Sequence, residues 1–119
     1  MTPLRICHYP RRDGKLPDGA RWVGRPSRWG NPWTIRYLGG RYELWAHNAF
    51  SGIATSDQHN AHWVAVEKLY RSWIEFGPYS KDLSGWLDPL RDVTALACAC
   101  PLHLPCHVDV LIELLVERQ

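Results

Sequence analysis

The 119-residue chain has no apolar run long enough to cross a bilayer, which excludes a membrane-spanning protein. Its first fourteen residues also lack the apolar stretch of a signal peptide, so we expect a cytoplasmic protein without a membrane partner. An excess of charge of either sign is missing as well. The formal net charge is +2, and a balance of this kind does not by itself indicate nucleic-acid binding.

Several familiar site patterns are absent too. The chain has neither a Walker loop nor a G-x-G-x-x-G fingerprint. Its four cysteines include no C-x-x-C pair, and without a secretory signal we do not expect them to form a disulfide framework. The length leaves no room for a second independent core, so we expect residues 1–119 to form a single domain.

What the chain does have is unevenly distributed. Nine Lys and Arg residues fall within the first 41 positions, opposed there only by Asp13 and Asp18. This half forms either a solvated basic face or an anion site. Seven tryptophans predict an aromatic core, with a minority free to stack on a ligand. Three histidines in the middle of the chain are expected at the surface, namely His47, His59 and His62.

The hydrophobic pattern predicts mostly short elements before residue 90. Two β-prone runs around Gly39-Gly40 are typical of a hairpin, and apolar residues at three- and four-residue spacing predict an amphipathic helix. We expect that helix to bury a face that includes Trp63. The expected elements are two strands at 4–8 and 21–24, the hairpin at 33–38 and 41–45, a polar surface excursion at 46–60, and two helices at 61–76 and 80–87.

The last third of the chain predicts the fold class. Residues 93–100, VTALACAC, are apolar without alternation, which is typical of a strand covered on both faces. After a short loop, residues 107–117 have helical spacing. We therefore expect an α/β fold, a single small domain with a short mixed sheet, two or three packing helices, and a Rossmann-like strand–loop–helix at the C-terminus. Ligands of such folds lie beyond the carboxyl ends of the strands.

A first motif, GRPSRWGNP, occupies residues 24–32. Its glycines allow close backbone approach, its first arginine offers a planar fork for phosphate or carboxylate, and a tryptophan can supply a flat wall for a base. The alternative is a rigid turn in which Arg25 pairs with an acidic neighbour and Trp29 fills the core. The candidate ligand-binding residues are Arg25, Ser27, Trp29, Gly30 and Asn31, joined by Cys100 from a second motif.

The second motif, CACPLHLPCHVDVL, occupies residues 98–111. Cys106 and His107 fall at the expected helix start, where free N–H groups and the helix dipole lower a thiol pKa. Burial of Cys106 would reverse that shift. Asp109, in the first turn, could orient His107 or hold the helix end. The candidate catalytic residues are therefore Cys106, His107 and Asp109.

Three interpretations of the second motif stay open. The first is a zinc site, because Cys98, Cys100, Cys106 and His107 offer three sulfurs and one nitrogen. The second is a small-molecule pocket in which Cys100, Cys106 or His107 does polar or nucleophilic work. The third is structural, because cysteine is a small and often buried filler.

The two motifs together resemble those of a phage and bacterial family described as domain of unknown function 4326. The resemblance implies a short strand, a G-R-x-S-x-W-G-N-P loop, a helical middle and a terminal C-x-C…P-C-H-x-D-V-L segment, and it implies a bacterial cell or a phage-infected host as the setting. It implies no activity. The matching residues are Gly24, Arg25, Ser27, Trp29, Gly30, Asn31, Pro32, Cys98, Cys100, Pro105, Cys106, His107, Asp109, Val110 and Leu111.

The leading functional hypothesis is the binding, with or without chemical processing, of a nucleotide or related anionic small molecule. It requires the two motifs to meet, so we expect Arg25 and His107 to line one cavity with Ser27 and Asn31. The alternative is a non-catalytic zinc-stabilised domain that binds nucleic acid or a protein partner through its basic half. The residues specify no reaction type, so whether the protein is an enzyme stays open, and zinc is the one cofactor they suggest.

Overall fold

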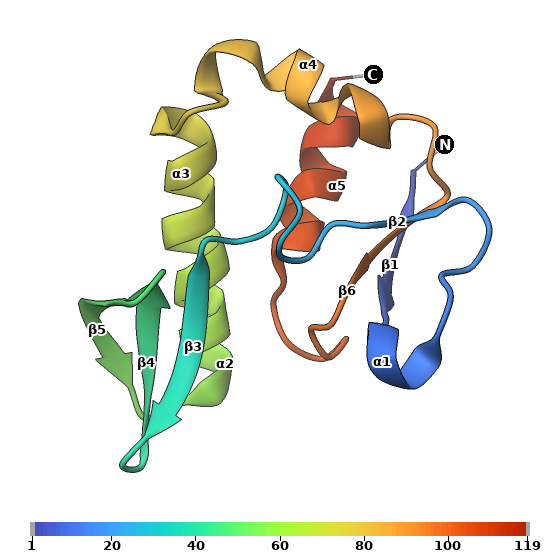
Figure 1. The fold of residues 1–119 in the computed structure, drawn as a ribbon. Coiled ribbons are helices and arrows are strands. Elements are labelled where there is room, and N and C mark those ends of the chain that lie inside the picture. The colour runs from blue at the N-terminus through green and yellow to red at the C-terminus, as the bar shows by residue number, and fades with distance from the viewer. Residues whose placement is uncertain (1, 119) are drawn as a thin grey trace.

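The computed structural model describes residues 2–118 (Figure 1). The strands are β1 (Leu4–Cys7), β2 (Ala20–Trp22), β3 (Trp33–Leu38), β4 (Arg41–Ala46), β5 (Ala49–Thr55) and β6 (Ala95–Cys98). The helical segments are α1 (Pro10–Asp13), α2 (Gln58–Trp63), η1 (Val64–Tyr70), α3 (Arg71–Phe76), η2 (Ser80–Asp82), α4 (Leu83–Leu87), η3 (Asp88–Leu90) and α5 (His107–Glu117). Within the described residues, no helix is long and apolar enough to span a membrane.

The parallel sheet has the order β1-β6-β2, so the apolar run near the C-terminus supplies its central strand. All four residues of β6 are buried, as its lack of alternation predicts. The strand is shorter than expected and ends at Cys98, and its C-terminal end leads toward α5. The expected strand–loop–helix unit is confirmed.

The antiparallel sheet has the order β3-β4-β5, and the expected hairpin around Gly39-Gly40 forms its first two strands. Residues 46–60 were expected to form a surface excursion with some helix. Helix α2 does begin there, at Gln58, but the prediction is wrong in part, because Ala49–Thr55 form a third strand. This strand lies at the sheet's edge and is mostly exposed, so its sequence has no apolar alternation to reveal it. The α/β class is confirmed, but the strands divide between two sheets instead of forming one mixed sheet.

Residues 58–76 form one long helix that winds as a π-helix from Val64 to Tyr70 (Figure 1). Asp57 caps its start by accepting a hydrogen bond from the Asn60 backbone N–H at 3.0 Å. We expected Trp63 on the buried face, yet 41% of it is exposed. The wider π-turns that follow Trp63 rotate the buried face away from it, which uniform 3.6-residue spacing does not anticipate.

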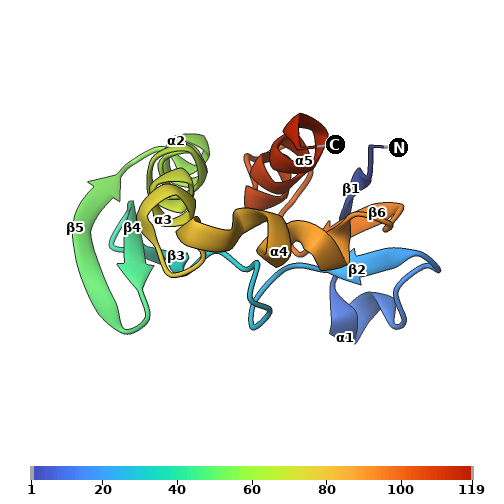
Figure 2. The same ribbon diagram turned by 90° about the horizontal axis from the view of Figure 1, so that it is seen from above.

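The main core lies between the parallel sheet, α5 and the long helix. Leu96 of β6 and Leu111 of α5 are fully buried there, and Figure 2 shows α5 on one side of the parallel sheet. A smaller apolar cluster, centred on Leu44, joins the antiparallel sheet to the long helix. The long helix therefore serves both sheets and holds them on either side of a shared cavity.

Candidate functional site

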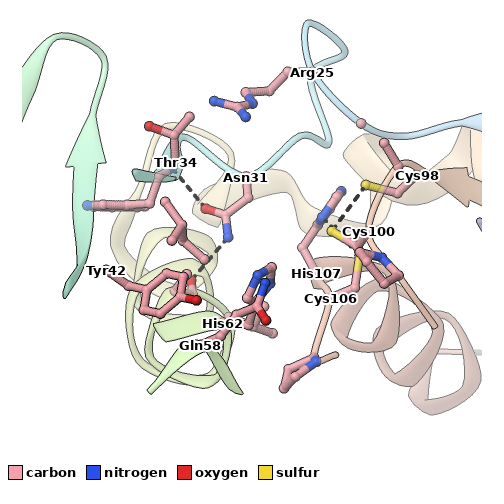
Figure 3. A pocket seen from close by; sticks show the side chains of 18 of the residues that line it. Arg25, Asn31, Thr34, Tyr42, Gln58, His62, Cys98, Cys100, Cys106 and His107 are labelled. Carbon is pink, nitrogen blue, oxygen red and sulfur yellow. Dashed lines mark hydrogen bonds between the residues drawn. The ribbon is translucent and has the colours of Figure 1, made fainter. Parts of the chain in front are cut away.

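A cavity of about 580 Å³ lies between the two sheets, and both sequence motifs reach it (Figure 3). The loop after β2, the antiparallel sheet, the long helix and the segment from β6 to α5 each supply a wall. The lining residues are Trp22, Gly24, Arg25, Asn31, Trp33, Thr34, Ile35, Tyr37, Tyr42, Gln58, His62, Ala65, Val66, Cys98, Ala99, Cys100, Pro101, Pro105, Cys106 and His107. The cavity lies beyond the carboxyl ends of β2 and β6, where α/β folds place ligands.

The first motif is a tightly packed loop that places Arg25 at the cavity. The indole of Trp22 donates a hydrogen bond to the Arg25 carbonyl at 3.1 Å and packs so closely on Gly24 that an added Cβ would lie 2.5 Å from its ring. A Cβ on Gly30 would lie 3.0 Å from the Arg25 backbone nitrogen. The glycines are therefore required by close packing around Arg25, and Gly30 does not line the cavity.

Trp29 is a core residue and not a ligand wall, so its assignment as a binding residue is wrong. It is 3% exposed and donates a hydrogen bond to the Trp86 carbonyl at 2.8 Å. Its own carbonyl accepts a hydrogen bond from the Tyr70 hydroxyl at 2.5 Å. The alternative interpretation, in which this tryptophan fills the core, is the one that agrees with the structure.

Ser27 and Asn31 differ in position. The Ser27 hydroxyl is buried outside the cavity lining and makes no hydrogen bond in the part of the chain that the structure describes, so Ser27 does not join the other residues. Asn31 does line the cavity, but its amide also fastens the loop to the long helix. It donates to the Ala65 carbonyl at 3.1 Å, within the π-helical segment, and accepts from the Trp33 N–H at 3.0 Å.

Arg5, from β1, holds the loop of the second motif. Its guanidinium donates to the carbonyls of Pro101 and Leu104 at 2.8 and 2.7 Å and pairs with the Asp109 carboxylate at 2.9 Å. Asp109 is therefore engaged with Arg5 and does not reach His107, and it does not line the cavity. The expectation that Asp109 orients His107 is wrong, because its position in the first turn directs it toward β1.

The three cysteines of the second motif converge at one wall of the cavity (Figure 3). The Sγ atoms of Cys98, Cys100 and Cys106 all lie within 4.8 Å of one another, and those of Cys98 and Cys100 are 3.7 Å apart. Cys100 follows the end of β6 and is not part of the strand, yet its sulfur still meets that of Cys98. The fourth cysteine, Cys7, lies outside this group.

Mutual hydrogen bonding separates the pKa values of these thiols. Bonds from Cys100 and Cys106 hold the pKa of the Cys98 thiol well below its ordinary value. Cys106 favours the Cys100 thiolate, but donation to Cys98 and burial prevail and raise the pKa of Cys100 to about 12. Hydrogen-bond contacts with the sulfurs of Cys100 and Cys98, together with burial, raise the pKa of Cys106. The expected lowering at Cys106 is wrong, because that thiol is 1% exposed and serves as a donor.

His107 is buried between the second motif and the loop after β2. Its Nε2 lies 2.8 Å from the Val23 carbonyl, and its Nδ1 lies 3.6 Å from the Cys106 sulfur. A carbonyl can only accept, so the hydrogen-bond network assigns a proton to Nε2. In the neutral ring, the lone pair of Nδ1 therefore faces the thiols.

Sequence reasoning missed His62 and Gln58, which line the opposite wall of the cavity. They are four residues apart on the long helix and therefore share one face with Ala65 and Val66. This spacing was available from the sequence, but the surrounding polar residues indicated a surface segment. Burial lowers the pKa of His62, although the Pro105 carbonyl partly offsets this by favouring the charged ring.

The lowered pKa of His62 predicts a pH-dependent stability. The unfolded chain binds a proton at this ring near pH 6.5, whereas the folded chain resists it. The contribution of His62 to stability is therefore complete above that pH, and it is lost as the pH falls from there through the lower pKa of the folded chain. Between about pH 7.5 and pH 5.5, we expect the His62→Gln variant to lose less free energy of unfolding than the wild type in urea titrations. His47→Asn, at an exposed turn, is the control and should keep the wild-type pH dependence. An unchanged pH dependence in His62→Gln would contradict the prediction.

Few charged side chains line the cavity. Among the described residues, Arg25 is the only Arg or Lys that lines the cavity, and no Asp or Glu lines it. The exposed guanidinium of Arg25 therefore faces no carboxylate partner there. The rest of the lining is aromatic or apolar, together with amide, hydroxyl, imidazole and thiol groups.

These features define a small α/β protein with one aromatic and thiol-lined cavity built from two sequence motifs. The chain belongs to the family described as Domain of unknown function (DUF4326), whose model matches residues 8–117. The family expected from the sequence is thereby confirmed over nearly the whole chain. Comparison with curated proteins and with solved structures finds no match.

Proposed function

We propose that this protein binds a small anionic molecule of the nucleotide class in the cavity between its two sheets. The observation that carries the proposal is a ligand-sized cavity whose lining has one guanidinium and no carboxylate. Its volume of about 580 Å³ falls within the range of ordinary small-molecule sites. A guanidinium binds phosphate through paired, charge-assisted hydrogen bonds, which assigns the anionic group of the ligand to Arg25.

The aromatic wall supports a ligand with a flat ring. Trp22, which is bonded to the Arg25 carbonyl, and Trp33 both border the cavity. Tyr37 and Tyr42 lie along the antiparallel sheet with ring centroids 4.8 Å apart. Such rings stack on nucleobases, with each base worth about 1–3 kcal/mol. Gln58, on the facing helix, offers both a donor and an acceptor to the edge of a base.

The basic half of the sequence supports a cavity ligand over an extended nucleic-acid surface. Three of its arginines form ion pairs within the fold, which leaves less free positive charge for an extended nucleic-acid surface. Arg5, Arg12 and Arg41 are in ion pairs, while Arg21, Arg28 and Arg36 lie over aromatic rings. The four free cysteines agree with a reducing, cytoplasmic setting.

The test is a thermal-shift and calorimetric screen with nucleoside mono-, di- and triphosphates, the matching nucleosides and inorganic phosphate. We expect the phosphorylated compounds to raise Tm, and Arg25→Gln to weaken their binding by about 1.5–3 kcal/mol, or roughly 10- to 150-fold in Kd. Because Arg25 is exposed, the affinity should also fall as salt concentration rises.

Arg28→Gln is the matched control. Arg28 lies in the same loop and is exposed, but it stacks on Trp29 outside the cavity lining, so its variant should bind with wild-type affinity. The proposal fails if no phosphorylated compound binds. It also fails if Arg25→Gln and Arg28→Gln weaken binding equally, because the effect would then come from net charge and not from the cavity.

A further inference from the structure

We propose that Cys98, Cys100 and Cys106 hold a zinc ion as three thiolate ligands, with a fourth coordination position open to the cavity. The inference deepens the proposed function and rests on it only for the ligand at that fourth position. Zinc sites with three protein ligands and one exchangeable position are the catalytic type, whereas four protein ligands make a structural site.

The spacing of the sulfurs carries the proposal. Tetrahedral zinc with bonds of about 2.3 Å to sulfur places its ligands about 3.8 Å apart. The sulfurs of Cys98 and Cys100 are 3.7 Å apart, and all three lie within 4.8 Å of one another, so an ion enters with small side-chain adjustments. Thiols are weak hydrogen-bond partners, and their mutual contacts alone explain poorly why three of them share one wall.

The surrounding structure holds the three ligands in place before an ion arrives. The loop between Cys100 and Cys106 is tied to β1 by the Arg5 guanidinium, through the carbonyls of Pro101 and Leu104. Cys98 is anchored at the end of the central strand, and Cys106 directly precedes α5.

His107 lies beside the three cysteines but is not one of the ligands. Its Nδ1 is 3.6 Å from the Cys106 sulfur, yet the ring does not join the set of groups that lie within 4.8 Å of one another. Its Nε2 is held by the Val23 carbonyl at 2.8 Å. All three cysteines line the cavity, so the fourth position is left to water or to a group of the bound ligand.

The experiment measures metal in the full-length protein purified without chelators. We expect about one zinc ion per chain by elemental analysis, and cobalt substitution should give sulfur-to-cobalt charge-transfer bands with the d–d bands of a tetrahedral site. In the native protein, a thiol reagent should modify Cys7 alone. Treatment with a chelator should then expose the other three thiols.

Variants identify the ligands. Serine substitution of Cys98, Cys100 or Cys106 should abolish zinc binding, whereas Cys7→Ser, the matched control outside the cluster, should retain it. His107→Gln preserves a donor toward the Val23 carbonyl and removes the imidazole, and it should also retain zinc. If the serine variants fail to fold, the cobalt spectrum and the thiol counts of the wild type decide the matter alone.

Several results would overturn the inference. They are the absence of zinc from protein that also shows no cobalt spectrum, the presence of copper or an iron–sulfur cluster in its place, and loss of zinc in His107→Gln, which would indicate a closed four-ligand site. Nucleotide binding by protein that takes up neither zinc nor cobalt would leave the proposed function intact and overturn the zinc centre. Zinc with no nucleotide binding would do the reverse.

Discussion

Replacement of Trp29 by alanine is expected to lower the free energy of unfolding by about 3–5 kcal/mol. The indole is 3% exposed, and its N–H satisfies the Trp86 carbonyl at 2.8 Å, so truncation opens a cavity and leaves a buried acceptor unpaired. The Trp29 carbonyl also accepts the Tyr70 hydroxyl, which joins the first motif to the long helix. Urea unfolding followed by circular dichroism measures the loss.

Trp63→Ala is the matched control for this substitution. Trp63 is 41% exposed on the long helix, so its removal should change stability far less. Trp29→Phe separates packing from hydrogen bonding, since it keeps a ring and loses only the N–H. A Trp29→Ala protein of wild-type stability that binds nucleotides poorly would contradict this account and restore Trp29 as a ligand wall.

Local sequence signals predicted the elements whose pattern reflects their own burial. The unbroken apolar run of 93–100 predicted the central strand. The helical spacing of the apolar residues predicted α5, namely Val108, Leu111, Leu114 and Leu115. The strand at residues 49–55 was not predicted, because an exposed edge strand forms by pairing with its neighbour and needs no apolar pattern of its own. Trp63 failed for another reason, since no periodicity rule anticipates a π-helical segment.

The site was partly predictable for related reasons. Arg25 and the thiols stood out because their chemistry is visible in the residue type, and the rule that ligands lie beyond strand ends brought the two motifs together. Residue type cannot show whether a polar or aromatic group faces a cavity or the core. For that reason Trp29 and Ser27 were wrongly predicted to bind a ligand. The role of Asp109 was wrongly predicted because its partner, Arg5, is distant in sequence.

The cysteines illustrate the same limit at the level of chemistry. A helix start lowers a thiol pKa only while the thiol keeps its solvation, and Cys106 is buried. The two neighbouring sulfurs, together with burial, raise the pKa of Cys106, whereas hydrogen bonds from Cys100 and Cys106 lower the pKa of Cys98. The pKa of Cys106 therefore depends on the distances to Cys98 and Cys100, and only the fold determines those distances.

Truncation of Leu111 to alanine is expected to lower the free energy of unfolding by about 2–5 kcal/mol. Leu111 is fully buried in the core cluster that joins α5 to the parallel sheet, and the loss includes both transfer of its side chain and the void left behind. Val116→Ala provides the control, because Val116 lies on the same helix with 45% of it exposed, so its truncation should lower the stability far less.

The Leu111→Ala substitution should also expose a thiol. Because α5 carries His107 and follows Cys106, loosening its packing should make the Cys106 thiol accessible at denaturant concentrations below the global unfolding midpoint. Wild-type stability of Leu111→Ala, or equal losses in both variants, would show that α5 is peripheral and that its packing does not hold the thiols in place.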